Sequence, residues 1–322
     1  MSSVTFLAGY TVHPWRIEDV EEAVALMNAC DMAAIGLMEH PLEEVRADWE
    51  GDIPDPDNSG WLVRAEDGLL VAIAEVTHTQ FQRFDGASYI HPDHRERGLE
   101  EALLGMIEAH AVAMLPKATH DKRVVLRVHP YSTETAEITL LVAHGFVEVR
   151  RFLIMQIVLP TEPLPIPEVP TSLTLRPFEP ERDALAVHAA QTEAFGDHWG
   201  SVPRSFEEWS QSHMGRRDFD PSLWFVVTDG EQIAGAIIGS HDLPDVGFVS
   251  MLGVRRAWRG RGVGMILLQA CFRAMQTAGK TTVALGVDAD NTTGAVRLYE
   301  RAGMHAVVTT LAMQKELRAA QV

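Results

Sequence analysis

Cysteine is scarce in this sequence of 322 residues, which contains only Cys30 and Cys271. Two cysteines cannot form the disulfide framework on which small secreted proteins depend, so the sequence favours a cytoplasmic location. The first ten residues, MSSVTFLAGY, lack the basic start and the long apolar run of a secretory signal peptide. No apolar stretch approaches the roughly 18–20 residues of a membrane-spanning helix, so no membrane partner is expected.

Basic residues are also in short supply. Lys and Arg total 27 against 45 Asp and Glu, which gives a formal net charge of −18 at pH 7. A chain this acidic lacks the basic surface that holds a nucleic-acid backbone, so no nucleic-acid partner is expected. The same charge weakly favours cationic partners through long-range attraction. The 46% of hydrophobic residues is enough for a core in each of about two domains.

A proline-rich segment separates two halves of the chain. The stretch PTEPLPIPEVP, residues 160–170, has five prolines among eleven residues and cannot continue a helix or a central strand. It predicts a semi-rigid extended linker, with a long loop inside one domain as the alternative. The predicted organisation is therefore a first domain at 1–160, a linker at 161–171 and a second domain at 172–322.

The two halves repeat the same signals. A strand, an Asp-Gly turn and a second strand begin at Trp61 and again at Trp224, an offset of 163 residues. The aromatic residues that end TVHPW and TLRPF, Trp15 and Phe178, have the same offset. Because the matching signals follow in the same order, the sequence predicts a duplicated domain.

Each half predicts the same order of elements: a strand, a helix, the hairpin, a strand, an Arg/Gly-rich loop, an amphipathic helix, a strand, a short helix and a final strand. The expected strands outside the hairpins lie near 10–15, 87–90, 123–128 and 152–159, and near 173–178, 246–254, 281–287 and 307–315. The first helices are expected at 20–28 and 184–195. This mixture predicts an α/β fold.

The second half contains a loop suited to an anion. The strand VGFVSMLGV ends at Val254 and continues into RRAWRGRGVG, which opens an amphipathic helix. Its glycines let the backbone approach a ligand, and the first turn of a helix offers unpaired N–H groups and a positive dipole end. Four arginines add donors that bind phosphate in bidentate fashion: Arg255, Arg256, Arg259 and Arg261. The loop therefore predicts a phosphorylated ligand.

Three kinds of phosphate loop compete for this segment. A P-loop needs a lysine that is missing here. A dinucleotide fingerprint needs a glycine where Met265 stands, and it normally follows the first strand of its domain, although Asp288 would suit the acidic partner. The third kind is an acyl-CoA site, which depends on a family resemblance.

The segment Arg259-x-x-Gly262-x-Gly264 resembles the [QR]-x-x-G-x-[GA] motif of the GNAT superfamily of acyl-CoA N-acyltransferases. The tail VDADNTTGAVRLYERAGM is similar to the family's V-x-x-x-N-x-x-x-x-x-x-L-Y-x-x-x-G-[FM]. Its matching residues are Val287, Asn291, Leu298, Tyr299, Gly303 and Met304. Because both halves share the pattern, the chain resembles a tandem GNAT protein, the arrangement of mycothiol synthase. The resemblance implies two GNAT-like domains, each a mixed, mostly antiparallel sheet flanked by helices.

The resemblance implies acetyl-CoA as cosubstrate and no metal. The pantetheine arm would pair with the backbone of Leu252, Gly253 and Val254. The pyrophosphate would bind the loop residues Arg259, Gly260, Arg261, Gly262, Val263 and Gly264. Asn291 has two open interpretations, a contact with the cofactor or its ordered water and the N-cap of the following helix.

The implied reaction is attack by the primary amine of a small molecule on the acetyl thioester. A backbone N–H near Leu252 would stabilise the oxyanion. Tyr299 is the candidate donor to the departing thiolate, with an ordinary half-buried aromatic as the alternative. Asp245 is the nearest acid that could act as base, but a solvated turn carboxylate is the favoured interpretation of this residue, and a water relay is a further alternative.

The segment 192–209 occupies the place where family members build the wall of the acceptor site. Four of its residues are candidates to face a cationic amine: Glu193, Asp197, His198 and Trp199. Packing at the end of a helix is the alternative interpretation. The acidic charge of the chain favours a cationic acceptor.

The corresponding loop in the first half is altered. Arg95 and Gly98 match the motif, but Glu100 stands where the second half has Gly264, and Leu141 stands at the tyrosine position. We therefore expect the first domain to bind acetyl-CoA weakly or not at all and to catalyse nothing.

The function implied is that of an acetyl-CoA-dependent N-acetyltransferase with its chemistry in the second domain. A non-catalytic acyl-CoA-binding or sensing module is one alternative. A mycothiol synthase-like enzyme is a narrower one. A monomer or a homodimer is expected, because an internal duplication mimics a dimer within one chain.

Overall fold

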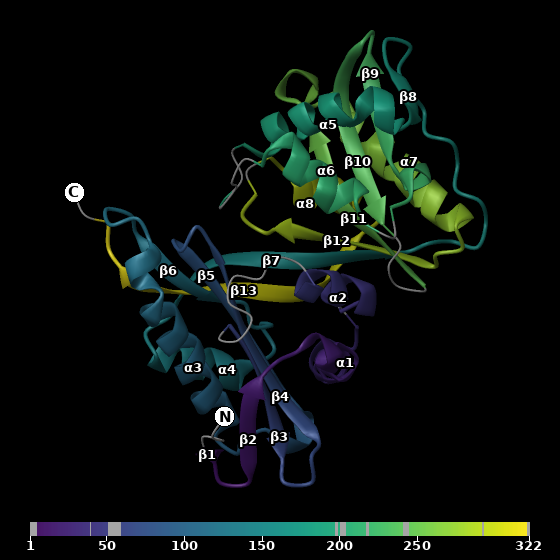
Figure 1. Cartoon of the computed structure of the whole chain (residues 1–322). Coiled ribbons are helices and arrows are strands. Elements are labelled where there is room, and N and C mark those ends of the chain that lie inside the picture. The colour runs from purple at the N-terminus through teal and green to yellow at the C-terminus, as the bar shows by residue number, and fades with distance from the viewer. Residues whose placement is uncertain are drawn as a thin grey trace. The chain divides into compact units, whose positions relative to one another are not determined.

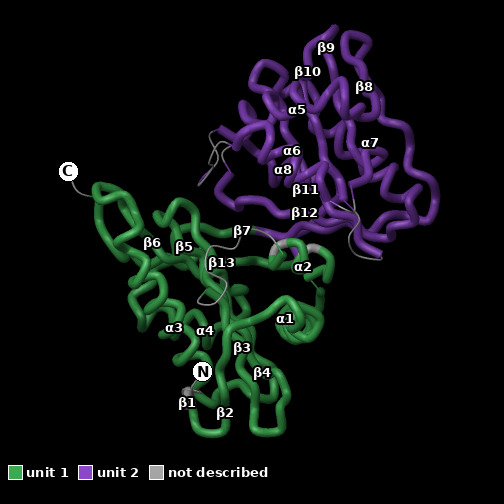
Figure 2. The backbone as a smooth tube through the Cα atoms, in the orientation of Figure 1, with its two compact units in different colours: residues 1–152, 308–322 green, residues 153–307 purple. Residues whose placement is uncertain are grey.

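The computed structural model describes residues 5–38, 40–50, 59–196, 199, 204–216, 219–240, 245–291 and 293–320. The chain forms two compact units (Figure 2). Unit 1 comprises Met1–Phe152 and Val308–Val322, and unit 2 comprises Leu153–Val307. Each combines a mixed, mostly antiparallel sheet with helices, so the fold prediction is confirmed (Figure 1). Within the described ranges, no helix combines the length and the apolar character needed to cross a membrane.

The sheet of unit 1 has the strand order β1-β2-β3-β4-β5-β6-β13. Its strands are β1 (Thr5–Leu7), β2 (Tyr10–Pro14), β3 (Gly60–Ala65), β4 (Leu70–Thr79), β5 (Arg83–Ile90), β6 (Val124–Val128) and, from Val308 onward, β13 (His305–Arg318). Its helices are α1 (Val20–Ile35), α2 (Leu42–Glu50), α3 (Leu99–Ala113) and α4 (Thr135–Ala143). Only the pairing of β5 with β6 is parallel among these neighbours.

Apolar side chains cover both faces of the unit 1 sheet. Neighbouring residues of a strand point to opposite faces, so Leu62 and Val63 of β3 enter different clusters. Leu62 packs in a cluster with Met27 of α1, whereas Val63 packs in a cluster with Leu103 of α3. Helices on both faces therefore bury the sheet between them.

The sheet of unit 2 has the order β7-β12-β11-β10-β9-β8. Its strands are, from Leu153 onward, β7 (Val147–Val158), then β8 (Thr174–Pro177), β9 (Phe225–Asp229), β10 (Gln232–Ser240), β11 (Val246–Val254) and β12 (Thr282–Asp288). Its helices are α5 (Pro180–Phe195), α6 (Phe206–Met214), α7 (Val263–Thr277) and α8 (Ala295–Arg301).

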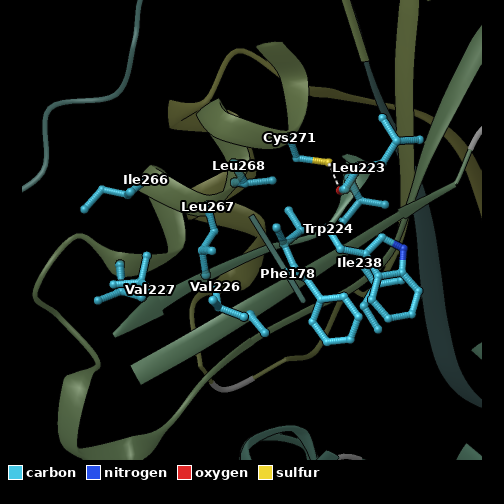
Figure 3. Close-up of a cluster of buried hydrophobic side chains, with 14 of the residues drawn as sticks. Phe178, Leu223, Trp224, Val226, Val227, Ile238, Ile266, Leu267, Leu268 and Cys271 are labelled. Atoms are coloured by element: carbon cyan, nitrogen blue, oxygen red, sulfur yellow. Dashed lines mark hydrogen bonds between the residues drawn. The ribbon is translucent and has the colours of Figure 1, made fainter. Parts of the chain in front are cut away.

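The core of unit 2 forms where α7 packs against the sheet (Figure 3). Leu267, Leu268 and Cys271 lie on the buried face of α7, as the apolar spacing predicts. They pack in one cluster with Val226 of β9 and Trp224. Burying each such side chain is worth about 1.5–3 kcal/mol, so this face fixes the position of α7.

The final strand of each half of the sequence belongs to the unit formed mainly by the other half. From Leu153 onward β7 is part of unit 2, where Met155 is fully buried. From Val308 onward β13 is part of unit 1, where Met313 is buried opposite Val128 of β6. The expected division at 161–171 assigns both strands to their own halves, because an apolar stretch identifies a strand but not the sheet that it joins.

The proline-rich segment contains no helix or strand, and it lies within unit 2, where it is bonded to α7. Leu164 N–H donates to Gln276 Oε1 at 2.8 Å. Gln276 Nε2 donates to the carbonyls of Pro160 (2.6 Å) and Glu162 (2.8 Å). Arg273 also bonds the Leu164 carbonyl. The segment is therefore held along α7.

Candidate functional site

Two parallel strands in unit 2 separate towards their carboxyl ends. β11 pairs with β12 at three positions, from Val246↔Thr282 to Phe248↔Ala284. β11 then continues to Val254, and its other edge stays paired with β10 as far as Gly235. The last residues of β11 are therefore no longer paired with β12. A ligand with amide groups can form hydrogen bonds with the backbone N–H and C=O groups on this edge of β11.

A β-bulge lies where this separation begins. Met251 is opposite Ile238 and Val249 is opposite Gly239, so Ser250 is an extra residue without a partner in register. Bulges bend a strand and redirect its backbone groups. The equivalent ladder of unit 1, between β4 and β5, runs from Ile90 to Arg83 without a shift of register. The bulge therefore distinguishes the two units at this place.

The amino terminus of α7 has no protein cap. Its N-cap residue is Gly262, with φ of 82°, and no side chain accepts a hydrogen bond there. This left-handed conformation favours glycine. The first turn contains no acidic residue. The first N–H groups of the helix and its positive dipole end are therefore available to an anion.

Gly264 brings three elements together. A Cβ at this position would lie 2.8 Å from Leu298 Cδ2 of α8 and 3.8 Å from Val254 Cγ2 of β11. The missing side chain thus lets the first turn of α7 pack against α8 and the end of β11. The sequence suggested a ligand contact for Gly264, and the structure adds a packing reason for glycine.

The loop before α7 is tied to the last turn of α5. Glu193 accepts from Arg255 Nε at 2.7 Å and from Arg256 N–H at 3.1 Å, and Arg255 lowers the pKa of this carboxyl. Arg259 donates to the carbonyls of Ala194 (3.1 Å) and Val254 (3.2 Å). Glu193, expected at the acceptor, is therefore engaged in holding the loop.

Tyr299 lies in α8, next to Leu298, the residue against which Gly264 packs. Its side chain is 8% exposed, and burial raises its pKa to about 12. Its hydroxyl makes no hydrogen bond with any described residue. The phenol therefore stays protonated at neutral pH and keeps its proton for a hydrogen bond.

Asn291 lies ahead of α8 and forms a turn. Its Oδ1 accepts from Thr293 N–H at 2.7 Å and from the Thr293 hydroxyl. The N-cap of α8 is Gly294, with φ of 78°, so Asn291 does not fill that role. A contact with the cofactor remains a prediction for Asn291.

The structure does not bring Asp245 to the end of β11. Asp245 is exposed, and its main-chain carbonyl accepts from the N–H groups of Thr281 (3.1 Å) and Thr282 (3.2 Å). Leu252 is seven positions further along the strand, roughly 23 Å away at the usual rise. The solvated turn carboxylate is the interpretation that this placement favours.

The structure describes only some of the residues expected at the acceptor site. Asp197 and His198 lie outside the described residues, and Trp199 is half-buried. Sequence reasoning missed Gln191, which is 3% exposed on α5 beside Gly253. Its Oε1 accepts from Trp209 Nε1 at 2.7 Å, and its Nε2 has no partner in the described part of the chain. No motif spacing marks this glutamine, so only the fold reveals it.

In unit 1 the matching loop is neutralised by its own carboxylates. Glu100 Oε1 accepts from Glu96 N–H at 2.9 Å. Arg95 Nη1 bonds both oxygens of Glu134, at 3.2 and 3.1 Å. The loop amide of Glu96 is thus occupied by protein. The start of α3 at Gly98 has no side-chain cap, like that of α7, but its first turn contains two carboxylates, Glu100 and Glu101.

Comparisons with known proteins agree with this geometry. The family model described as Acetyltransferase (GNAT) family matches residues 185–304, the range that contains β11, the loop, α7 and α8. The mycothiol acetyltransferase of Thermomonospora curvata is 31% identical over 248 residues, covering 75% of this chain and 77% of that protein.

Solved structures match nearly the whole chain. A GCN5-related N-acetyltransferase from Sphaerobacter thermophilus has a TM-score of 0.84 at 32% identity and covers 98% of both chains. A tandem GNAT protein from the clavulanic acid biosynthesis pathway has a TM-score of 0.73 over 97% of this chain and 100% of its own. At 17% identity this second match shows a shared fold. The resemblance seen in the motifs is thus confirmed, and the chain belongs to the acetyltransferase (GNAT) family, in a tandem arrangement.

Proposed function

We propose that this acetyltransferase moves the acetyl group of acetyl-CoA to the primary amine of a small molecule, and that unit 2 carries out the reaction. The observation that carries the proposal is the meeting of three features: the separated end of β11, the uncapped start of α7, and the buried phenol of α8. Unit 1 lacks the bulge, and the first turn of its helix α3 contains Glu100 and Glu101, whose charge disfavours an anion. It is therefore assigned a non-catalytic role.

Each feature of the site matches one part of the cosubstrate. The amides of the pantetheine arm would bond the β11 backbone at Leu252, Gly253 and Val254. The diphosphate would bind N–H groups from Gly260 to Gly264, where the helix dipole and Arg261 favour negative charge. The N–H of Arg259, expected from the sequence to take part, already donates to the Arg256 carbonyl at 3.3 Å. Arg255 takes no part, because Glu193 already holds it.

In the proposed reaction only one side chain, Tyr299, contacts the reacting groups, and a backbone N–H and water do the rest. The amine nitrogen attacks the thioester carbonyl carbon, the C–S bond breaks, and a backbone N–H on the open edge of β11 stabilises the oxyanion. Tyr299, with its pKa at about 12, is a weaker acid than a thiol of ~8.5. It therefore stabilises the thiolate by hydrogen bonding. The proton of the ammonium leaves through water, because Asp245 lies at the other end of β11.

The relatives named mycothiol acetyltransferases make a cysteinyl amine of the mycothiol type the first acceptor to try. The acidic charge of the chain favours an acceptor with a net positive charge. Fold alone does not set the acceptor, since one scaffold serves many substrates.

The test combines binding with turnover in the intact protein. Calorimetric titration with acetyl-CoA should give one site per chain, and CoA release should appear with at least one member of a panel of primary amines. Binding without turnover for any amine would favour the acyl-CoA-sensing alternative. An absence of binding heat would overturn the proposal.

A further inference from the structure

Unit 1 contains a cavity of about 360 Å³ that acetyl transfer in unit 2 does not use. The parallel pairing of β5 with β6 ends at Gly86↔Val128, while β5 continues to Ile90. The cavity lies at this opening, between residues of α1, β4, β5, β6 and α4. Unit 1 thus keeps the space between separated strands although its phosphate loop is closed.

The lining of this cavity is strongly acidic. Its ionisable carboxyl groups are Asp31, Glu75, Asp85, Glu134 and Glu137. Against these, the lining contains one arginine, Arg95, which Glu134 already engages. Asp85 is paired with Arg83 at 2.8 Å and lies 3.6 Å from His129. The lining therefore has five carboxyl groups against one arginine and two histidines, His40 and His129, which leaves an excess of acidic groups.

Asp31 is a buried carboxylate with one oxygen still open. Its side chain is 1% exposed, and Oδ1 accepts from the Tyr131 hydroxyl at 3.1 Å. Oδ2 receives no hydrogen bond from the residues that the structure describes, and His40 Nε2 is its neighbour at 3.2 Å. A buried carboxylate is costly unless donors satisfy it, so a ligand with N–H groups has a place to bind.

Glu137 is a second carboxyl without a partner among the described residues. Burial, and then the neighbouring Glu134, raise its pKa to about 7, whereas Arg95 opposes the shift. A bound cation would stabilise the ionised form of Glu137, because its charge compensates for the hydration that the carboxylate loses on burial. Asp31 and Glu137 come from different helices, α1 and α4, and line the same cavity.

The lining of the cavity also includes two aromatic side chains. Tyr89 and Tyr131 line the cavity beside the carboxyl groups. Carboxylates combined with aromatic rings suit an organic ammonium ion, which gains from both hydrogen bonds and ring faces. In the described part of the chain, no group of three His, Cys, Asp or Glu side chains is arranged to hold a metal ion. The chemistry therefore favours an organic cation over a metal.

We propose that the cavity of unit 1 binds a small organic cation that carries a primary ammonium group, at a site distinct from the acetyl-transfer site of unit 2. An acyl-CoA phosphate is disfavoured there, because Glu100 occupies the loop amide and Arg95 is paired. The proposal does not depend on which amine unit 2 acetylates.

The test uses tyramine and spermidine as cationic probes and tyrosol as a neutral control, since tyrosol has a hydroxyl where tyramine has an ammonium group. Calorimetry on the intact chain without acetyl-CoA should detect at least one of the two cations and a binding of tyrosol at least about tenfold weaker. Hydrogen–deuterium exchange should slow in α1 and α4 when the cation binds. Acetyl-CoA is titrated separately, so that failure of this proposal and failure of the transferase assignment stay distinguishable.

Two variants locate the site. Glu137→Gln and Asp31→Asn should each weaken binding of the cation about tenfold, the usual effect of losing a charged hydrogen bond. Glu137→Gln breaks no described contact, so it carries the test if Asp31→Asn fails to fold. Asp121→Asn, which removes an equal charge from an exposed side chain, is the matched control and should bind as the parent does. Equal affinity for tyrosol, no binding of either cation, an unchanged Glu137→Gln variant, or protection confined to β11 and α7 would each overturn the proposal.

Discussion

At the scale of single residues, Tyr299 is the side chain with the sharpest expected effect. Replacing it by phenylalanine removes a hydroxyl that bonds no described residue, so the fold should tolerate the change. The lost hydrogen bond to the thiolate should lower kcat by about tenfold to a hundredfold, with little change in the KM for acetyl-CoA. Steady-state kinetics with a turned-over amine measure both.

Tyr10→Phe is the control for this variant, because its hydroxyl contacts His94 in unit 1. It should leave kcat unchanged. A loss below about threefold in Tyr299→Phe would remove the proposed role.

Glu137 makes stability depend on pH. Its pKa is about 7 in the folded chain against 4.5 for the ordinary carboxyl, so the native state holds the extra proton between these values. The free energy of unfolding should therefore fall as pH rises through this window, by up to about 3 kcal/mol. Glu137→Gln removes the titration, so urea unfolding should show the variant more stable than its parent at pH 8 and equal to it at pH 5. An equal difference at both pH values would contradict the assignment.

Residues of local motifs could be predicted, and residues paired over long range could not. Gly262 and Tyr299 are visible because the motif fixes their spacing within one segment. The role of Glu193 is invisible in the sequence because Arg255, its partner, lies 62 residues away. Asp245 was chosen by nearness in sequence, which an extended strand converts into a long distance.

At the scale of elements, the start of α7 should respond to charge. Met265→Glu places a carboxylate in the first turn, where it favours the helix dipole by about 0.3–1 kcal/mol. The same charge repels a diphosphate, so acetyl-CoA affinity should fall about tenfold while the melting temperature stays the same or rises. Calorimetry and thermal unfolding measure the two effects.

Gln269→Glu adds the same charge further along α7, at an exposed position away from the helix start. It should leave the affinity within about twofold of the parent, because the effect of a helix end fades after the first turn. Equal losses in both variants would indicate general repulsion and count against a diphosphate at the helix start.

Elements with strong periodicity were predicted, and irregular features were not. The strand before the loop was expected at 246–254, the bounds of β11, and α7 follows from its apolar face. The bulge at Ser250 leaves no mark, because the apolar pattern of the strand continues through it. α6 was overlooked, although Ser205 and Glu208 form a capping box that signals a helix start.

At the scale of the whole molecule, the exchange of final strands determines which unit is destabilised by a mutation in β7 or β13. Met155→Ala should loosen unit 2, and Met313→Ala should loosen unit 1, each by about 2–5 kcal/mol, because both side chains are fully buried in those cores. Hydrogen–deuterium exchange should rise in β12 for the first variant and in β6 for the second. The reverse pattern would contradict the unit boundaries.

The duplication was visible in the sequence because matching signals recur at a constant offset. The composition of the units was not, because the apolar residues of β7 and β13 identify strands but do not indicate which sheet accepts them. Their assignment depends on packing partners such as Val128, which lies far from Met313 in the chain.

The exchanged strands also affect how the chain emerges from the ribosome. Unit 1 is encoded almost entirely first, yet its sheet lacks β13 until residues 308–318 have been translated. During that interval one edge of β6 is not paired with β13, and unpaired strand edges promote aggregation of nascent chains. The sheet of unit 1 therefore stays incomplete while the second half is translated, and slow or stalled translation there should favour aggregation of the nascent chain.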